Sequence, residues 1–207
     1  AIPLKLEETQ LDEYVIERLK LPKTKKPDLS EWEALITEIR KPKPSIRIGI
    51  VGKYVELHDA YMSVREALYH AGIPNNRHVD IEWIHSGDLE KGKGWEQFEG
   101  LDGIVVPGGF GERGVEGKIQ AARWARENNV PYLGLCLGMQ VMCIEFARHI
   151  IGNDEANSTE FDAQTDHPVI SLMPDQTHLT DMGGTMRLGA YPCKLESGTK
   201  AARAYQQ

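Results

Sequence analysis

The sequence predicts an α/β fold, in which a doubly wound and mostly parallel sheet over residues 46–207 follows a short helical tail. Two observations support this prediction: strand-like apolar runs alternate with segments of helical period, and those runs are apolar on both faces. Strands buried on both faces are typical of parallel sheets that helices cover from either side. With 207 residues, of which 41% are hydrophobic, the chain can bury one substantial core.

The first 45 residues do not look like a domain of their own. A short helix is expected at residues 11–19, and a second helix is expected to start with Ser30 as N-cap and Glu33 as its capping-box partner. Two basic, proline-broken connectors follow these helices, at residues 21–27 and 41–44. We interpret residues 1–45 as the end of a preceding domain and a linker, and residues 46–207 as the next domain.

Four strands are expected in that domain, at residues 46–54, 79–84, 103–107 and 130–136. Between them, Val64, Leu68 and Ala71 mark one amphipathic helix, and Val115, Ile119 and Ala122 mark another. The third strand is too apolar for an exposed edge. Because the carboxyl ends of parallel strands share one edge of a sheet, the loop after the third strand should meet the end of the fourth.

Cys136 stands between Gly134 and Gly138, where the fourth strand runs into an apolar helix-like segment. This is the layout of a nucleophile elbow, with Cys in place of Ser. Glycines suit such a turn because a Cβ would clash with the crowded backbone on either side. A thiol there also lies at the positive end of a helix dipole. We interpret Cys136 as a nucleophile; the alternative is a small buried hydrophobic residue.

A second glycine-rich stretch, Gly108-Gly109-Phe110-Gly111, follows the third strand. Attack of a thiolate on an amide or ester builds an oxyanion, which requires fixed donors about 3 Å away. The backbone N–H groups of Gly108 and Leu137 could supply them. A plain tight turn is the alternative, and the predicted position beside Cys136 favours the oxyanion loop.

Charge and cysteine content exclude several classes of protein. The net charge of -7, with the acidic residues spread along the chain, argues against nucleic acid and anionic membranes as partners. Three cysteines, an odd number, with no signal peptide or membrane-length apolar run predict a reducing, cytosolic compartment without disulfides. Cys143, in line with Met139 and Phe146, is expected in the core. No Cys or His spacing predicts a metal site.

Residues 107–111 and 134–140 resemble the class I glutamine amidotransferases, whose domain has a flavodoxin-like fold. Further stretches narrow the resemblance to the CTP synthase family. They lie at residues 52–57, 59–61, 113–117, 157–161 and 183–189, and upstream at residues 2–4, 11–14 and 29–32. The upstream stretches are similar to the end of that family's synthetase domain and its linker, so the resemblance spans essentially the whole chain.

The resemblance implies a reaction in two places. Cys136 attacks the side-chain amide of glutamine, the thioester is hydrolysed to glutamate, and the ammonia serves the ATP-dependent amination of UTP to CTP in pyrimidine biosynthesis. No cofactor or metal is implied in this domain, whereas Mg²⁺ and ATP belong to the synthetase domain. Also implied are GTP as an allosteric activator, with residues 113–116 in its loop, and a cytoplasmic homotetramer.

The resemblance also assigns site residues. Gly108 and Leu137 form the oxyanion hole, while Gln140 and Glu160 hold the polar groups of glutamine. The remaining substrate contacts that it implies are Gly109, Phe110, Gly138 and Met139. Glu160 can pair with the substrate ammonium. The alternative interpretation is that Glu160 is a solvated surface residue. Phe110 either lines the pocket or packs as an apolar plug.

The sequence departs from the family's pattern at the general base. The family takes it from a His-Pro-Glu stretch near the C-terminus, which is not found in residues 1–207. Among the seven histidines, His167 precedes a proline, but Val169 stands where the acid is needed. We therefore expect a fragment of a longer enzyme. Two alternatives stay open: a noncatalytic glutamine-binding or regulatory module, and another Cys-elbow hydrolase such as a γ-glutamyl hydrolase, against which the tail argues.

Overall fold

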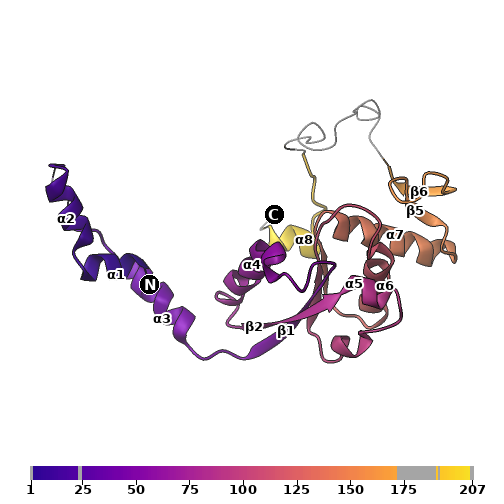
Figure 1. Cartoon of the computed structure of the whole chain (residues 1–207), viewed down its shortest axis with the longest axis horizontal. Helices are drawn as coiled ribbons and strands as arrows, with labels where there is room; N and C mark the ends of the chain where they lie inside the picture. Colours follow the sequence, from indigo (N-terminus) through magenta and orange to yellow (C-terminus); the bar gives the residue numbers. More distant parts are fainter. Residues whose placement is uncertain (1, 23–24, 172–189, 191, 206–207) are drawn as a thin grey trace.

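The fold is known from a computed structural model that describes residues 2–22, 25–171, 190 and 192–205. The stretch 183–189, named from the sequence, and His178, one of the seven histidines, lie outside these residues. The described chain forms an arm of three helices followed by an α/β body (Figure 1). The predicted fold class is confirmed.

A four-stranded parallel sheet forms the centre of the body, in the order β2-β1-β3-β4. The strands are β1 (Ser45–Gly52), β2 (His78–His85), β3 (Gly103–Val106) and β4 (Tyr132–Gly134). Every pairing in this sheet is parallel, and Val106 of β3 lies beside Gly134 of β4. β3 is fully buried, as its apolar sequence predicts, whereas β4 lies at the edge and leaves Leu133 54% exposed.

The two faces of β1 enter different apolar clusters because side chains alternate along a strand. Ile50 packs with Val55 and Tyr61 on the face that α4 (Met62–Gly72) covers. Val51 joins the larger cluster on the other face. Burying one such side chain fully contributes about 1.5–3 kcal/mol. Helices therefore cover the sheet from both sides, and the sheet is doubly wound.

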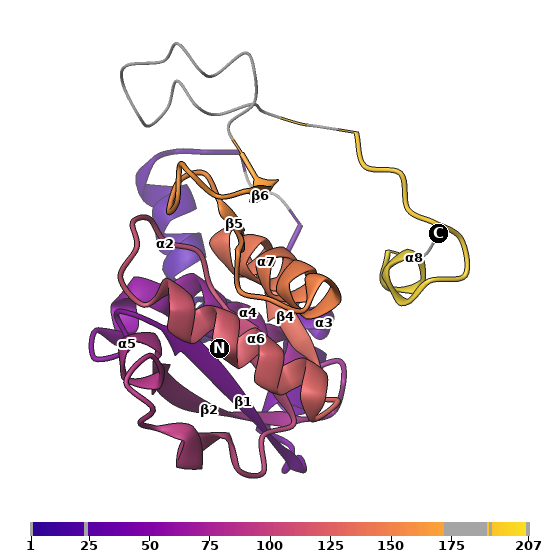
Figure 2. The same cartoon turned by 90° about the vertical axis from the view of Figure 1, so that its right-hand side faces the viewer.

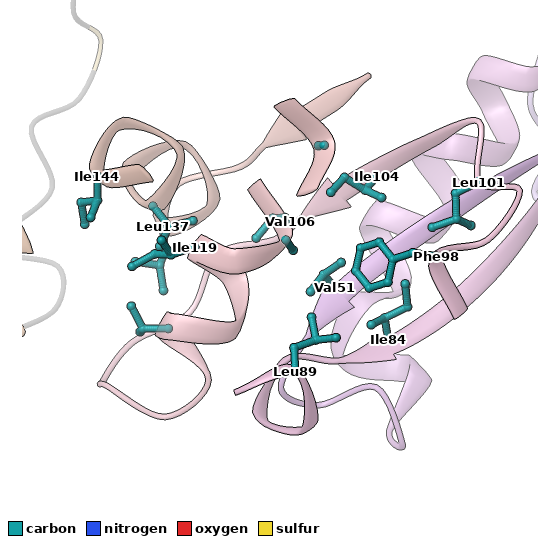
Figure 3. Packing of buried hydrophobic residues seen from close by; sticks show 14 residues of the cluster. Val51, Ile84, Leu89, Phe98, Leu101, Ile104, Val106, Ile119, Leu137 and Ile144 are labelled. Carbon is teal, nitrogen blue, oxygen red and sulfur yellow. The ribbon is translucent and has the colours of Figure 1, made fainter. Parts of the chain in front are cut away.

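The larger cluster lies under three helices, α5 (Ser86–Leu89), α6 (Val115–Glu127) and α7 (Leu137–Ile151). α6 and α7 lie side by side across the sheet (Figure 2). Figure 3 shows Ile119 of α6 next to Leu137 of α7, and Val106 of β3 belongs to the same cluster. An ion pair also joins the two helices, since Arg126 Nη2 lies 2.7 Å from Oε1 of the buried Glu145. The core thus fixes the start of α7 against the end of β3.

The prediction that Cys143 lies in the core is wrong. The buried stripe of α7 consists of Leu137, Val141 and Ile144, at the i, i+4, i+7 spacing of one helix face. Cys143 is half-buried beside that stripe, and its Sγ lies 3.7 Å from Sδ of the exposed Met139. The line that it shares with Met139 therefore belongs to the outer side of α7.

The arm consists of α1 (Ile2–Glu8), α2 (Leu11–Arg18) and α3 (Ser30–Arg40), and it extends away from the body (Figure 1). Among the described residues of these helices only Ile36 is buried. The predicted cap is wrong, because Ser30 is already helical and Leu29 occupies the N-cap position. Asp28 Oδ1 instead accepts a hydrogen bond from the Ser30 N–H at 3.0 Å, which lowers the pKa of Asp28.

Beyond α7 the chain adds elements that the sequence did not predict. These are β5 (Ala156–Ser158) and β6 (His167–Ile170), which pair in parallel, and the short α8 (Lys200–Ala204). Two 3-10 turns earlier in the chain, His58–Tyr61 and Trp95–Phe98, were not predicted either. β5 and β6 both contact α7. No helix in the described part of the chain is long and apolar enough to cross a membrane.

Candidate active site

Cys136 occupies the turn between β4 and α7, as the elbow prediction requires. Its backbone has φ 53° and ψ -112°, a left-handed conformation that residues with a Cβ rarely adopt. The turn is stabilised from both sides, since the Leu135 N–H donates to the Val106 carbonyl at 2.9 Å and the Cys136 carbonyl accepts from the Met139 N–H at 3.0 Å. The thiol is exposed. Strained backbone held by its surroundings is typical of functional sites.

The two flanking glycines are required by close backbone contacts. A Cβ on Gly138 would lie 1.8 Å from the Val106 carbonyl oxygen, and a Cβ on Gly134 would lie 2.4 Å from the carbonyl carbon of Gly138. Real Cβ atoms do not approach backbone this closely. The Tyr132 hydroxyl donates a hydrogen bond to the Gly138 carbonyl at 2.7 Å and so also stabilises the first turn of α7. Burial raises the pKa of Tyr132, so this hydroxyl stays protonated.

The loop after β3 meets the elbow, as the shared sheet edge predicts. A Cβ on Gly108 would lie 3.2 Å from the Cβ of Cys136 and 3.7 Å from its Sγ. Leu137 is the first residue of α7, and the N–H of a first helical residue has no acceptor within its own helix. The arrangement therefore places Gly108, Cys136 and a free-ended helix N-terminus together. A carbonyl carbon attacked by Sγ would have its oxygen close to these backbone groups.

Two lysines hold this loop, and the sequence analysis missed both. Lys118, on α6, is 1% exposed and donates from Nζ to the Pro107 carbonyl at 3.0 Å. Lys53, just after β1, donates from Nζ to the Phe110 carbonyl. One signal for Lys118 was present, since position 118 completes the i, i+3, i+4, i+7 stripe of Val115, Ile119 and Ala122. A lysine at a core position of an amphipathic helix is unusual.

The other predicted substrate residues differ in where the structure places them. Gln140 and Met139 follow Cys136 in the first turn of α7, half-buried and 44% exposed respectively. Phe110 is 85% exposed, so it does not act as an apolar plug. Glu160 lies exposed in the turn after β5. Among the described residues, no hydrogen bond or ion pair links the Glu160 carboxylate to the elbow, and its role stays a prediction.

None of the described histidines pairs with Cys136. His167 starts β6 and lies opposite Ala156, whose carbonyl accepts from Arg148 Nε at 2.9 Å. Arg148 is twelve residues beyond Cys136, so the strand pair that carries His167 is bonded to α7 about three helical turns from its start. The His167 imidazole does have an acidic neighbour, Glu155, with Nε2 3.7 Å from Oε2. Among the described residues, no hydrogen bond links this pair to Cys136, as a general base for the thiol would require.

Within the described residues no group of three or more His, Cys, Asp or Glu side chains could hold a metal ion. At the elbow the structure brings together a strained thiol, backbone N–H groups and a nearby ammonium group. That set suits nucleophilic attack on a carbonyl group.

Comparison with known proteins agrees with this geometry. The family model of the class I glutamine amidotransferases matches residues 56–207, and the chain belongs to that family. Over 204 residues it is 57% identical to a CTP synthase of Chloroflexus aurantiacus, and over 205 residues 58% identical to a CTP synthase of Roseiflexus sp.. Each alignment covers 99% of this chain and 37% of the relative. The chain thus spans little more than a third of these relatives' length and matches their C-terminal part.

A solved structure is similar as well. The glutaminase domain of the CTPS of Trypanosoma brucei, with bound acivicin, is 43% identical, with a TM-score of 0.56. The match covers 63% of this chain and 51% of that one.

Proposed function

We propose that this chain is the glutaminase part of a CTP synthase, in which Cys136 hydrolyses glutamine to glutamate and ammonia. The single observation that supports this most directly is the strained turn at Cys136 beside Gly108. It is a nucleophile elbow adjoining a glycine loop, in a chain that belongs to the class I glutamine amidotransferases. The CTP synthases that share more than half of its residues support the narrower assignment.

In the proposed reaction the Cys136 thiolate attacks the Cδ carbonyl of glutamine and forms a C–S bond. The backbone N–H groups of Gly108 and Leu137 donate to the oxyanion of the tetrahedral intermediate. Collapse of this intermediate breaks the C–N bond, and the nitrogen leaves as ammonia once it is protonated. Water then hydrolyses the glutamyl thioester to glutamate. Gln140 and Glu160 are proposed to bind the polar groups of the substrate, with Gly109, Phe110, Gly138 and Met139 around it.

The rest of the proposed function concerns the whole enzyme. Ammonia would pass to a synthetase part that uses ATP and Mg²⁺ to aminate UTP to CTP, with GTP as an activator of the glutaminase. We further propose a homotetramer and a cytoplasmic location. These proposals rest on the similarity to the CTP synthases, of which this chain covers a minor part.

A labelling experiment tests the assignment of Cys136. A diazo-ketone analogue of glutamine should label Cys136 ahead of the half-buried Cys143 and the exposed Cys193, because only Cys136 lies at the elbow. Peptide mapping by mass spectrometry locates the label, and excess glutamine should protect. Label mainly on Cys143 or Cys193 would refute the assignment.

A second candidate is favoured by one observation, the lack of a histidine beside Cys136 among the described residues. On this reading residues 1–207 alone bind glutamine without turning it over, because general acid–base catalysis is typically worth about 10²- to 10⁴-fold. Glutamate release by residues 1–207, measured with Cys136→Ala as the blank, distinguishes the two candidate functions. Turnover similar to that of intact family members, lost in Cys136→Ala, would show that a base lies within the chain. His167→Ala would then be the next variant to measure.

A further inference from the structure

Lys118 is a buried cation whose position is imposed by the packing of α6. A Cβ on Gly117 would lie 1.9 Å from the Ser86 carbonyl oxygen, so α6 packs against α5 at van der Waals contact there. The next residue along the helix is directed into the interior and is 1% exposed. The acceptor that its ammonium finds at 3.0 Å is the Pro107 carbonyl, not a carboxylate.

The surroundings of this ammonium belong to the elbow and its loop. A Cβ on Gly109 would lie 3.8 Å from Lys118 Nζ and 3.7 Å from Cε of Lys53. The neighbouring Gly108 adjoins Cys136. The titratable groups that act on Lys118 are Lys53, from the end of β1, and Cys136, from the start of α7. One buried charge therefore lies beside Gly109, the residue that follows the glycine in contact with the nucleophile.

Burial and then Lys53 lower the pKa of Lys118 to about 8, whereas the Cys136 thiolate opposes this change. The attraction between thiolate and ammonium means that each charge favours the other. A methionine or leucine would fill the same space without desolvating a charge, and buried charges of this kind commonly lower the stability of a protein. A cation retained at such a place is a candidate for a functional role.

We propose that Lys118 is a positioning residue of the Cys136 site, whose buried ammonium holds the Pro107–Gly109 turn against the elbow and supplies the positive charge that balances the Cys136 thiolate. This inference rests on the proposed function, because it assigns Lys118 to the same reaction. It adds a long-range element to the site, since Lys118 lies on α6 and neither on the elbow nor on the loop.

The test measures how fast iodoacetamide alkylates Cys136 as a function of pH. The thiolate displaces iodide to form a thioether, so the rate follows the thiolate fraction and requires neither glutamine nor a general base. Lys118→Met should lower the rate at Cys136 about tenfold at pH 7 and move the midpoint of the pH–rate profile upward. Lys118→Arg, which keeps charge and donors, should restore most of the rate. If Lys118→Met does not fold, Lys118→Gln has the same expected result.

Arg123→Met is the matched control, since it removes one positive charge from the exposed side of the same helix. It should leave the Cys136 profile unchanged, and Cys193 in the same digest should react equally in every variant. An unchanged midpoint in Lys118→Met, an equal loss in Arg123→Met, or a parallel change at all three cysteines would overturn the proposal. The diazo-ketone experiment on the unmodified chain tests the proposed function separately, so that the two failures are distinguishable.

Discussion

The elbow and the loop after β3 lie side by side, but they are held in different ways. The elbow is held by its own backbone, because Gly134 and Gly138 allow main-chain atoms to meet and the Leu135 N–H bonds to Val106. The loop is held by the ammonium groups of Lys118 and Lys53, which belong to other parts of the chain, and it leaves Phe110 85% exposed. The nucleophile therefore sits on a rigid element, whereas the oxyanion loop depends on distant side chains.

The largest effect should follow loss of the atom that only the elbow supplies. The proposed function predicts that Cys136→Ala in the complete enzyme abolishes glutamine-dependent CTP formation, since removal of a nucleophile costs on the order of 10⁶-fold. Synthesis from added ammonia should be spared. Assays with the two nitrogen donors measure this, with Cys143→Ala as control. Loss of both activities at unchanged thermal stability would mean that Cys136 serves the fold instead.

Glycine-to-alanine substitutions should distinguish the elbow, which its own backbone holds, from the loop after β3, which lysine side chains hold. Gly138→Ala brings a Cβ to within 1.8 Å of the Val106 oxygen and should lower the free energy of unfolding by about 4 kcal/mol. Gly111→Ala meets no atom within 4 Å and bears only the strain of its φ of 74°, about 1 kcal/mol. Urea unfolding measures both. Equal losses of the free energy of unfolding in the two variants would contradict the contrast between the elbow and the loop.

The buried ammonium that holds the loop should make stability depend on pH. The pKa of Lys118 is about 8 in the folded chain, against its ordinary value of 10.5 in the unfolded chain. Between these two pH values the unfolded chain therefore binds more protons at this site. The free-energy cost of burying the charged Lys118 is fully present below pH 8. As the pH rises through the interval between the two pKa values, the free energy of unfolding increases by about 3 kcal/mol. The difference between the unmodified chain and Lys118→Met isolates this term. A difference that does not vary with pH would refute it.

The smallest effect concerns the support of the elbow by a side chain. Tyr132→Phe removes the hydrogen bond to the Gly138 carbonyl and should lower the free energy of unfolding by about 1 kcal/mol. Tyr69→Phe, at a half-exposed position on α4, is the matched control and should cost less. If Tyr132→Phe costs several kcal/mol, the elbow depends on side chains more than its backbone contacts imply.

Much of the fold was predictable because it depends on local pattern. The four parallel strands, α4, α6 and α7 follow from apolar periodicity, and the residue ranges of the strands agree with prediction to within a few residues. The elbow was predictable for the same reason: a strand, a cysteine between two glycines and an apolar helix specify the turn within a few residues. The meeting of Gly108 with Cys136 followed from one topological rule about parallel sheets.

The sequence by itself thus determined the class of fold and the position of Cys136 on a strained turn, since both depend on neighbours close along the chain. Only the tertiary structure decided which side chains are buried: Lys118 is inside, while Phe110 and the line of Met139 and Cys143 are toward the outside. The hydrogen bond from the Ser30 N–H to Asp28 and the pairing of β5 with β6 were decided there as well. The physical reason is that burial and pairing depend on which element packs against a residue, and periodicity along one element does not contain that information.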